Sequence, residues 1–384
     1  MKKYSVNILK PDMTFSDAVY IDETNMLVPA DVQIRQNDIE KLKAWGIDSV
    51  QSNGSPNIDI ENNETGNTLT DNLIPSFSEF PENKKAYNNY MLFIEKMNNV
   101  FLKITRGESI DYQVTNVIGT QLLQVLKSEP GKFIGFILGG DVKGFEMAKS
   151  SVNTAILSAL CATELRLPNH RILNITIGAL LHDIGMLRLP KEITEKRGGL
   201  SDHERKIIHT HPLLSQRMAL KEFSYHDDVG NIVLHHHERW NGEGYLYRLA
   251  GEKIDFGARI VSIADAFEAM ISPKSYRNPI VGYQAIKNLL SDNSRRFDPD
   301  ILKVFVMTMG VYPIGSIIML NSGAIARVAY IRAAAPMRPK IQVLTDENTK
   351  LLKKEDTISI DLLEAKNLYI KKPLDAQELS QIIT

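Results

Sequence analysis

A histidine and an aspartate stand side by side where an apolar run ends, in the stretch Gly178-Ala-Leu-Leu-His182-Asp183-Ile-Gly185-Met186. The run predicts a buried helix that delivers two strong metal ligands to a dry site. Adjacent residues of a helix point about 100° apart, so the imidazole of His182 could bind one ion while the carboxylate of Asp183 bridges to a second. Taken alone, however, the pair fits a buried core histidine and a capping aspartate better than a metal site.

The distribution of the other histidines favours the metal site, because all nine fall between residues 170 and 237. His211 and the pair His236-His237 follow the His-Asp pair at intervals that suit one helix and one loop each. Asp265 comes next, as a single embedded acid in another apolar, helix-like segment. Neighbouring helices of one bundle can each give one or two ligands to a shared core. We therefore expect these residues to meet in space.

The donor set in this cluster contains nitrogen and oxygen but no thiolate. Imidazole and carboxylate suit Fe, Mn, Zn or Ni rather than a sulfur-based structural site. Two ions about 3.5–4 Å apart that share a carboxylate and a water generate hydroxide near neutral pH and stabilise both oxygens of an in-line phosphoryl displacement. The pattern therefore predicts metal-assisted hydrolysis of a phosphoester.

The elements that position these residues are predicted from periodicity and composition. Residues 1–50 mix short β-like runs with one helix-like segment and predict a small α+β module, and residues 51–83 are rich in turn formers and predict a linker. Residues 84–140 predict a helical connector, and residues 141–310 predict a helical core that carries the candidate ligands. Short apolar runs separated by Gly, Asn and Pro predict a small β-barrel-like appendage at 311–384. The expected fold is mainly α.

The connector carries an apolar stripe at helical spacing. Such a stripe predicts either a part of the core or the seam of a homodimer formed through residues 84–127. The stripe consists of Tyr87, Tyr90, Met91, Ile94, Met97, Phe101 and Ile104.

Bulk properties exclude several classes of protein. The 384 residues include 45 Lys and Arg and 46 Asp and Glu, so the formal net charge of −1 creates no global field for a nucleic acid polymer. No apolar run approaches the ~20 residues of a membrane span, and residues 1–12 lack the apolar core of a signal peptide. The only cysteine, Cys161, excludes an internal disulfide and fits a reducing compartment. We expect a cytoplasmic protein without a membrane partner.

Several motifs, in this order, resemble the HD-GYP family, a branch of the HD superfamily of metal-dependent phosphohydrolases that cleaves cyclic di-GMP in bacterial signalling. They are HDIG at 182–185, the later His211-Pro212, HHERWNGEGY at 236–245, the helix with Ala264-Asp265 and Lys274-Ser-Tyr-Arg277. The resemblance covers roughly residues 140–310, and the segments at 4–50 and 311–370 resemble modules that flank this family.

The resemblance implies hydrolysis of cyclic di-GMP to pGpG, and on to GMP, by a metal-bridged hydroxide. It implies two divalent ions, Fe or Mn, bound by His182, Asp183, His211, His236, His237 and Asp265, with Glu146 at a position that helps to hold a third ion in some members. Asp183 and Tyr245 become catalytic residues by family position, and the substrate-binding residues become Tyr245, Arg239, Lys274 and Arg277.

The chain departs from the family pattern at four positions. Ser150 stands where the family has its first His, Met186 where it has the Lys of HDIGK, Leu246 where it has the Pro of GYP, and Glu268 where it has an Asp. A hydroxyl is a poor ligand for these ions, and Met186 offers no charge to a phosphate. A charge-assisted contact of that kind is worth roughly 1.5–3 kcal/mol. The departures therefore predict weak or absent turnover.

Two alternatives stand beside this function, and the departures motivate the first of them. The first is an inactive signalling module that binds cyclic di-GMP or a protein partner without cleavage. The second is an HD phosphohydrolase that acts on another nucleotide. Five further histidines are expected on the surface or behind the ligands, with His235 the best exception because it adjoins two of them; they are His170, His203, His209, His226 and His235.

Overall fold

A computed structural model of the chain describes residues 77–79, 81–111, 113–139, 144–196, 198–272, 282–292, 295–332, 334–352 and 357–382. Before residue 58 it describes residues 2–6, 9, 13–15, 17–21, 26–28, 32, 34, 38–39, 42, 47, 49–54 and 56–57. The chain divides into two compact units, Met1–Leu69 and Thr70–Thr384.

The described part of the first unit is a small antiparallel sheet with its own core. The strand order is β1 (Lys2–Ser5), β5 (Ser49–Ser52), β3 (Val19–Tyr20), β4 (Met26–Val28), and β2 (Thr14–Phe15) pairs separately with β6 (Pro56–Asn57). Buried apolar side chains, Phe15, Val19, Ile34, Leu42 and Val50 among them, close this core. The short strands match the expected α+β module, whereas most of its helix-like segment, which spans residues 36–45, lies outside the described residues.

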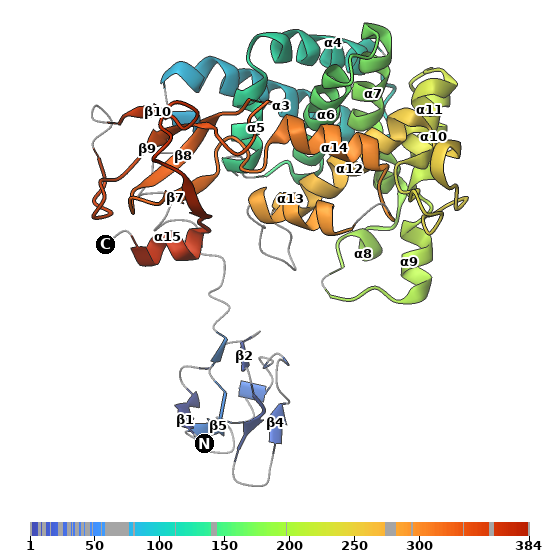
Figure 1. Cartoon of the computed structure of the whole chain (residues 1–384). Coiled ribbons are helices and arrows are strands. Elements are labelled where there is room, and N and C mark those ends of the chain that lie inside the picture. Colours follow the sequence, from blue (N-terminus) through green and yellow to red (C-terminus); the bar gives the residue numbers. More distant parts are fainter. Residues whose placement is uncertain are drawn as a thin grey trace. The chain divides into compact units, whose positions relative to one another are not determined.

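The second unit is mainly helical, as the periodicity predicts (Figure 1). Its α-helices before the C-terminal sheet are α3 (Lys84–Arg106), α4 (Gln113–Ser128), α5 (Pro130–Gly139), α6 (Glu146–Glu164), α7 (Asn169–Leu181), α8 (Lys191–Thr194), α9 (Asp202–Ile208), α10 (His211–Lys221), α11 (Asp227–His235), α12 (Phe256–Ile271), α13 (Gly282–Ser291) and α14 (Pro299–Met309). Short 3-10 helices are η2 (Phe77–Glu79), η3 (Pro81–Asn83), η4 (Ile184–Arg188) and η5 (Gly251–Lys253).

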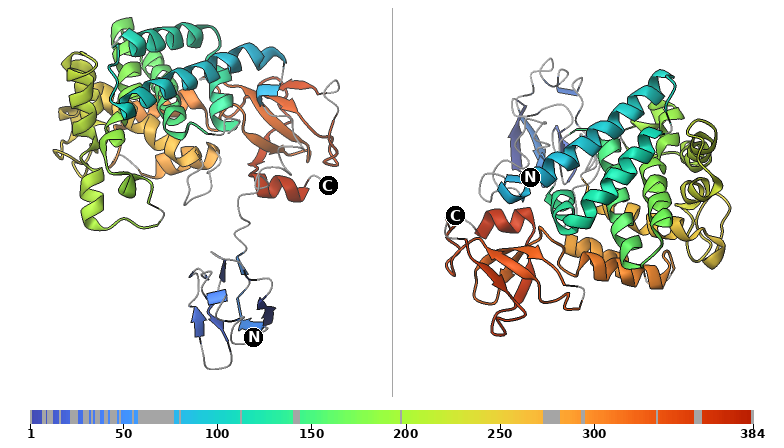
Figure 2. Two further views of the ribbon diagram at one scale, coloured as in Figure 1. Left: turned by 180° about the vertical axis from the view of Figure 1, so that it is seen from behind. Right: turned by 90° about the horizontal axis from the view of Figure 1, so that it is seen from above.

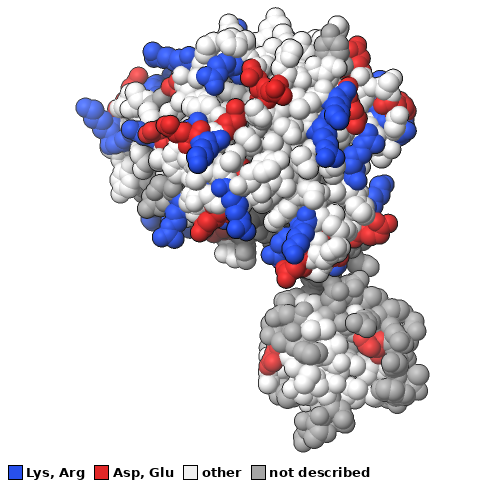
Figure 3. Space-filling model, turned by 90° about the vertical axis from the view of Figure 1, so that its right-hand side faces the viewer, with Lys and Arg blue, Asp and Glu red and all other residues white. Residues whose placement is uncertain are grey.

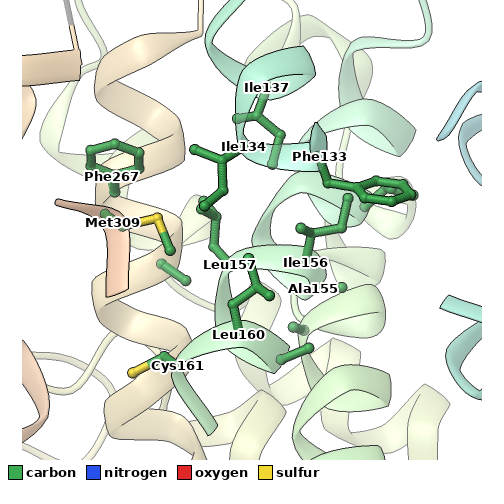
Figure 4. Close-up of a cluster of buried hydrophobic side chains, with 14 of the residues drawn as sticks. Phe133, Ile134, Ile137, Ala155, Ile156, Leu157, Leu160, Cys161, Phe267 and Met309 are labelled. Atoms are coloured by element: carbon green, nitrogen blue, oxygen red, sulfur yellow. The ribbon is translucent and has the colours of Figure 1, made fainter. Parts of the chain in front are cut away.

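Helix α6 lies at the centre of this unit and contacts α3, α7, α12 and α14. Its residues Val152–Ala162 are all buried, as is typical of a helix surrounded by other helices. Figure 4 shows how side chains from α5, α6, α12 and α14 interleave there, with Ile134, Leu157, Phe267 and Met309 in view. The ends of the helices that carry the candidate ligands are thereby held against a close-packed core.

The apolar stripe of α3 belongs to the same core. Tyr90, Ile94, Met97 and Ile104 are at most 1% exposed, and the ring of Tyr90 packs on that of Phe136 in α5 with 5.8 Å between centroids. Of the two expected roles, part of the core or a homodimer seam, the structure therefore shows the core. Because these side chains are enclosed within their own chain, the stripe gives no support to a homodimer seam.

The C-terminal segment forms an antiparallel sheet in the order β10 (Ser359–Asp361), β9 (Lys340–Val343), β8 (Ile325–Tyr330), β7 (Ile317–Leu320), β11 (Ile370–Pro373), followed by α15 (Ala376–Ile382). Predicted apolar runs become β7, β8 and β9, whereas Val311–Gly315 is a turn region. Ile318, Val328 and Ile341 share one core cluster with the helices. The sheet and the helices therefore lie side by side, as the right-hand view of Figure 2 shows.

Charges of both signs are interspersed on the face of the second unit drawn in Figure 3, as the nearly balanced composition predicts. Among the described residues, no helix combines the length and the apolar character that crossing a bilayer requires.

Candidate metal centre

The fold brings all of the predicted metal ligands except Glu146 together. His182 and Asp183 follow the end of α7, His211 begins α10, His236 and His237 follow α11, and Asp265 lies within α12. One ligand atom from each of Asp183, His211, His236 and His237 lies within 4.8 Å of the others. His182 and Asp265 join this group, because the His182 Nε2 atom is 3.4 Å from Asp183 Oδ2 and 3.6 Å from Asp265 Oδ1.

Gly185 allows the His-Asp pair to approach α10. Its N–H donates to the hydroxyl oxygen of Ser215, at 2.7 Å. A Cβ atom at this position would lie only 2.3 Å from the carbonyl oxygen of His211 and 2.6 Å from the backbone nitrogen of Ser215. Only glycine fits so close to another backbone. The glycine of the HDIG motif therefore helps to place Asp183 beside His211.

Three histidine rings are oriented by the backbone that directly precedes them. The Nδ1 atoms of His182, His211 and His236 each lie 2.7 Å from the carbonyl oxygen of the residue three positions earlier. A carbonyl oxygen can only accept, so each Nδ1 carries a proton, and each ring directs its Nε2 atom to the centre, where that atom binds an ion once it is unprotonated. Metal-binding histidines are held in the same way.

The two oxygens of Asp183 face different histidines. Oδ1 lies 3.0 Å from His211 Nε2 and 3.7 Å from His236 Nε2, while Oδ2 faces His182. The Nε2 atom of His182 is buried and has no hydrogen-bond partner in the described part of the chain. A buried nitrogen of this kind beside two carboxylates is what a cation would satisfy. The cluster therefore fits the binding of divalent metal.

The ionisation of the cluster is consistent with that fit. Burial alone would raise the pKa of Asp183, but the surrounding histidines hold that pKa well below its usual value. Burial would likewise raise the pKa of Asp265, but His182 lowers it to about 2. Burial and the charge of His236 keep the pKa of His237 well below the ordinary value. Both carboxylates are therefore ionised at neutral pH, and His237 is available as a neutral ligand.

Tyr245 covers one side of the cluster. Its N–H donates to the carbonyl oxygen of His237, at 3.3 Å, and the two rings lie 4.8 Å apart. The ring of His209 stacks on Tyr245 at 3.8 Å, nearly parallel. Burial, followed by the charges of Asp183 and Asp265, raises the pKa of the Tyr245 phenol, so the hydroxyl keeps its proton. His209 was expected on the surface or behind the ligands, and nothing in the sequence marks its contact with Tyr245.

The loop that carries Tyr245 is organised by Glu238. Its buried carboxylate accepts hydrogen bonds from the N–H groups of Tyr247, at 2.6 Å, and Leu249, at 3.0 Å. A Cβ atom on Gly244 would lie 2.4 Å from the backbone nitrogen of Arg239, so a glycine is required there as well. The Glu and the second Gly of the HHERWNGEGY block therefore shape the loop.

Two of the departures from the family pattern contact each other. The Ser150 hydroxyl donates to Glu268 Oε2 at 2.7 Å, and the Ser272 hydroxyl donates to Oε1 at 2.6 Å. The amide of Asn153 also reaches Oε1, at 3.3 Å. Glu268 is fully buried, so these donors replace the water that its carboxylate loses. The structure thus shows Ser150 as a hydrogen-bond donor to Glu268.

Other predicted residues lie apart or outside the description. Glu146 is exposed at the start of α6, where it pairs with Lys149 at 3.1 Å, and it is not in the ligand group found among the described residues. Arg239 is exposed beside the Tyr245 loop. Lys274 and Arg277 lie outside the described residues.

Comparisons with known proteins agree with this geometry. The model of the HD domain family matches residues 142–301, and a KOW domain associated with HD domains matches residues 317–382. The chain is 26% identical to the cyclic di-GMP phosphodiesterase PdeB of Borreliella burgdorferi, over 94% of this chain and 93% of that protein. It is 32% identical to a cyclic di-GMP phosphodiesterase of Pseudomonas aeruginosa, over 66% of this chain and 61% of that protein.

Among solved structures, an HDG"Y"P protein from Bdellovibrio bacteriovorus matches with a TM-score of 0.44 and 17% identity, over 79% of this chain and 97% of that one. The order of the ligand motifs, the HD domain match and the curated relatives lead to one family. The chain contains an HD domain at residues 142–301, and its ligand motifs and curated relatives support an HD-GYP-like family.

Proposed function

We propose that this protein is a metal-dependent phosphodiesterase that hydrolyses cyclic di-GMP to pGpG and GMP. The observation that carries the proposal is the position of Asp183, whose two oxygens face two different sets of histidine nitrogens. Two relatives that are similar to most of this chain are named cyclic di-GMP phosphodiesterases, and they support the choice of substrate. Three further proposals accompany it: the ions are Fe or Mn, two of them are bound by the cluster and Glu146 helps to hold a third, and the protein works in the cytoplasm.

The candidate ligands divide into two sets around Asp183. His211, His236 and His237 would hold one ion with Oδ1, and His182 and Asp265 would hold the second with Oδ2. Divalent ions bound there supply a Lewis acid for the phosphodiester and lower the pKa of water near it. The Nδ1 hydrogen bonds to backbone carbonyls keep the Nε2 atoms aimed at the centre, so the chain itself provides a preorganised set of ligands.

Tyr245 orients the substrate in this proposal. Its hydroxyl keeps its proton and can therefore donate a hydrogen bond to a phosphate or ribose oxygen. The stack with His209 holds the ring in place, and the Glu238 carboxylate holds the loop on which the ring is carried. Arg239, exposed at the same loop, adds positive charge for the phosphate.

The direct test is hydrolysis by the purified protein loaded with Mn or Fe, with products separated by chromatography. We expect cyclic di-GMP to be converted to pGpG. His211→Ala should abolish turnover and lower metal content, whereas His203→Ala, a matched change at an exposed histidine, should do neither. A wild-type protein that binds metal normally and leaves cyclic di-GMP intact would overturn the proposal.

A second candidate is the inactive signalling module that binds cyclic di-GMP, or a protein partner, without cleaving it. It is favoured by the hydrogen bond between Ser150 and Glu268 and by the uncharged Met186 in η4. The double variant Ser150→His, Met186→Lys separates the two functions. A large gain of turnover over an inert parent supports the signalling module, and equal turnover in both supports the enzyme. A panel of cyclic dinucleotides, including 3′3′-cGAMP, tests the third possibility of another substrate, because some relatives are named for that nucleotide.

A further inference from the structure

A second arginine is held beside Arg239 by backbone hydrogen bonds. The N–H of Trp240 donates to the carbonyl oxygen of Arg296 at 2.9 Å, and the N–H of Asn241 donates to that of Arg295 at 2.8 Å. These bonds join the loop that follows α11 to the turn that precedes α14. Arg296 is thereby placed next to the loop that carries Tyr245, although the sequence separates the two arginines widely.

The Arg296 guanidinium lies within Coulombic range of Tyr245, which covers the metal centre, and of the candidate ligand Asp265. The positive charges of Arg296 and Arg239 both oppose the effect of burial on the pKa of the Tyr245 phenol. Burial and the charge of Arg239 lower the pKa of Arg296, while Asp292 and the candidate ligand Asp265 raise it. Both guanidinium groups therefore act on the side of the centre that Tyr245 covers.

Little negative charge within the described residues neutralises this pair. The nearest carboxylate oxygen paired with Arg296 belongs to Asp292, at 3.9 Å, and the side chain of Asp292 is 51% exposed. Arg239 forms no ion pair with a described residue. Two like charges that lie near each other repel, so a bound anion stabilises the arrangement. A guanidinium group matches a phosphate in geometry as well as in charge, because it can donate two parallel hydrogen bonds.

We propose that Arg296 is a substrate-binding residue that acts with Arg239 on a phosphate group at the Tyr245 side of the metal centre. This inference rests on the proposed function, and it assigns to Arg296 a positive charge of the kind that Met186 cannot supply. The competing explanation is structural, because the Arg296 guanidinium also lies over the ring of Phe297, 4.9 Å from its centroid. The two explanations differ in what a loss of charge does to anion binding.

The experiment compares Arg296→Gln and Arg296→Lys with Arg295→Gln as the matched control. Arg295 is the exposed neighbour in the same turn, and its substitution leaves the backbone hydrogen bond to Asn241 in place. The full-length Mn-loaded proteins are titrated by calorimetry with inorganic phosphate and with cyclic di-GMP, at low and high salt. Metal content and the melting temperature Tm are measured for each variant.

We expect Arg296→Gln to weaken phosphate binding about ten- to a hundred-fold, to reduce the salt dependence and to leave metal content and Tm unchanged. Arg296→Lys should fall between wild type and Arg296→Gln, and Arg295→Gln should stay within about twofold of wild type. Wild-type phosphate affinity in Arg296→Gln overturns the inference, as does an equal loss in Arg295→Gln. A fall in Tm without a change in affinity identifies the structural role instead.

The titration with phosphate separates this inference from the proposed function. If the wild-type protein cleaves no cyclic dinucleotide but loses phosphate affinity on Arg296→Gln, the enzyme proposal fails and the assignment of Arg296 as an anion-binding residue stands. If cyclic di-GMP is cleaved equally well by wild type and Arg296→Gln, with equal KM, the proposed function stands and the assignment of Arg296 fails.

Discussion

The substitution Gly185→Ala tests whether the approach of η4 to α10 builds the metal centre. The added Cβ would lie 2.3 Å from the carbonyl oxygen of His211 and 2.6 Å from the backbone nitrogen of Ser215. Ordinary contacts between such atoms are about 3.5 Å, so the two segments must separate by about 1 Å. Because both atoms belong to backbone, a change of rotamer cannot relieve the contact.

The expected cost has a stability part and a site part. Overpacking of a close-packed region costs about 1–3 kcal/mol, and the hydrogen bond from Gly185 N–H to Ser215 is worth about 1 kcal/mol more. We therefore expect a loss of about 2–4 kcal/mol in the free energy of unfolding. The same shift moves His211 away from Asp183, from which its Nε2 atom now lies 3.0 Å. A displacement of about 1 Å can cost a hundred-fold in rate.

The assay is urea unfolding together with metal content by elemental analysis and metal affinity by calorimetry. The matched control is Gly199→Ala, because a Cβ atom there meets nothing within 4 Å. The control should change the free energy of unfolding by less than about 0.5 kcal/mol and leave metal content unchanged. If Gly185→Ala keeps the unfolding midpoint and the metal affinity of wild type, the proposed role of this approach is refuted.

Three further outcomes are expected. Burial lowers the pKa of His182, but the neighbouring carboxylates raise it well above its usual value. Because the imidazole must release a proton before it binds an ion, metal affinity should fall as the pH is lowered from about 8 to about 6. Calorimetry in buffers of different ionisation enthalpy measures that proton, and a pH-independent affinity contradicts the reasoning. Ser150→Ala removes one donor from Glu268 and should lower the free energy of unfolding by about 1–3 kcal/mol with unchanged metal content; loss of metal with unchanged stability would identify Ser150 as a ligand. Glu238→Ala leaves two N–H groups of loop 242–249 without their acceptor. The variant should therefore raise KM about ten-fold or more with unchanged metal content. Wild-type kinetics would contradict the role given to this carboxylate.

The candidate ligands were predictable because their geometry is mostly local. An apolar run that ends in His182-Asp183 predicts a helix end with two ligands, and the helix bounds agree with that reading. Even the orientation of the rings follows from local structure, since each Nδ1 of His182, His211 and His236 bonds to a carbonyl three residues earlier. The mainly helical class followed from the same periodicity.

Other features depend on contacts between distant parts of the chain. The two expected roles of the α3 stripe could not be separated by periodicity, because core and seam have the same pattern; the packing of Tyr90 on Phe136 separates them. The contact of His209 with Tyr245 depends on how the 242–249 loop folds back over α10.

The types and order of the ligands, the helices that carry them and the family they imply are determined by the sequence itself, because residue chemistry and helical spacing are local properties. Only the tertiary structure shows that Ser150 donates to Glu268 and that Arg296 accepts a backbone hydrogen bond from Trp240, the residue after Arg239. Each of these contacts joins residues on different helices or loops. Such contacts depend on how separate elements pack against one another, and the spacing of residues along the chain does not determine that packing.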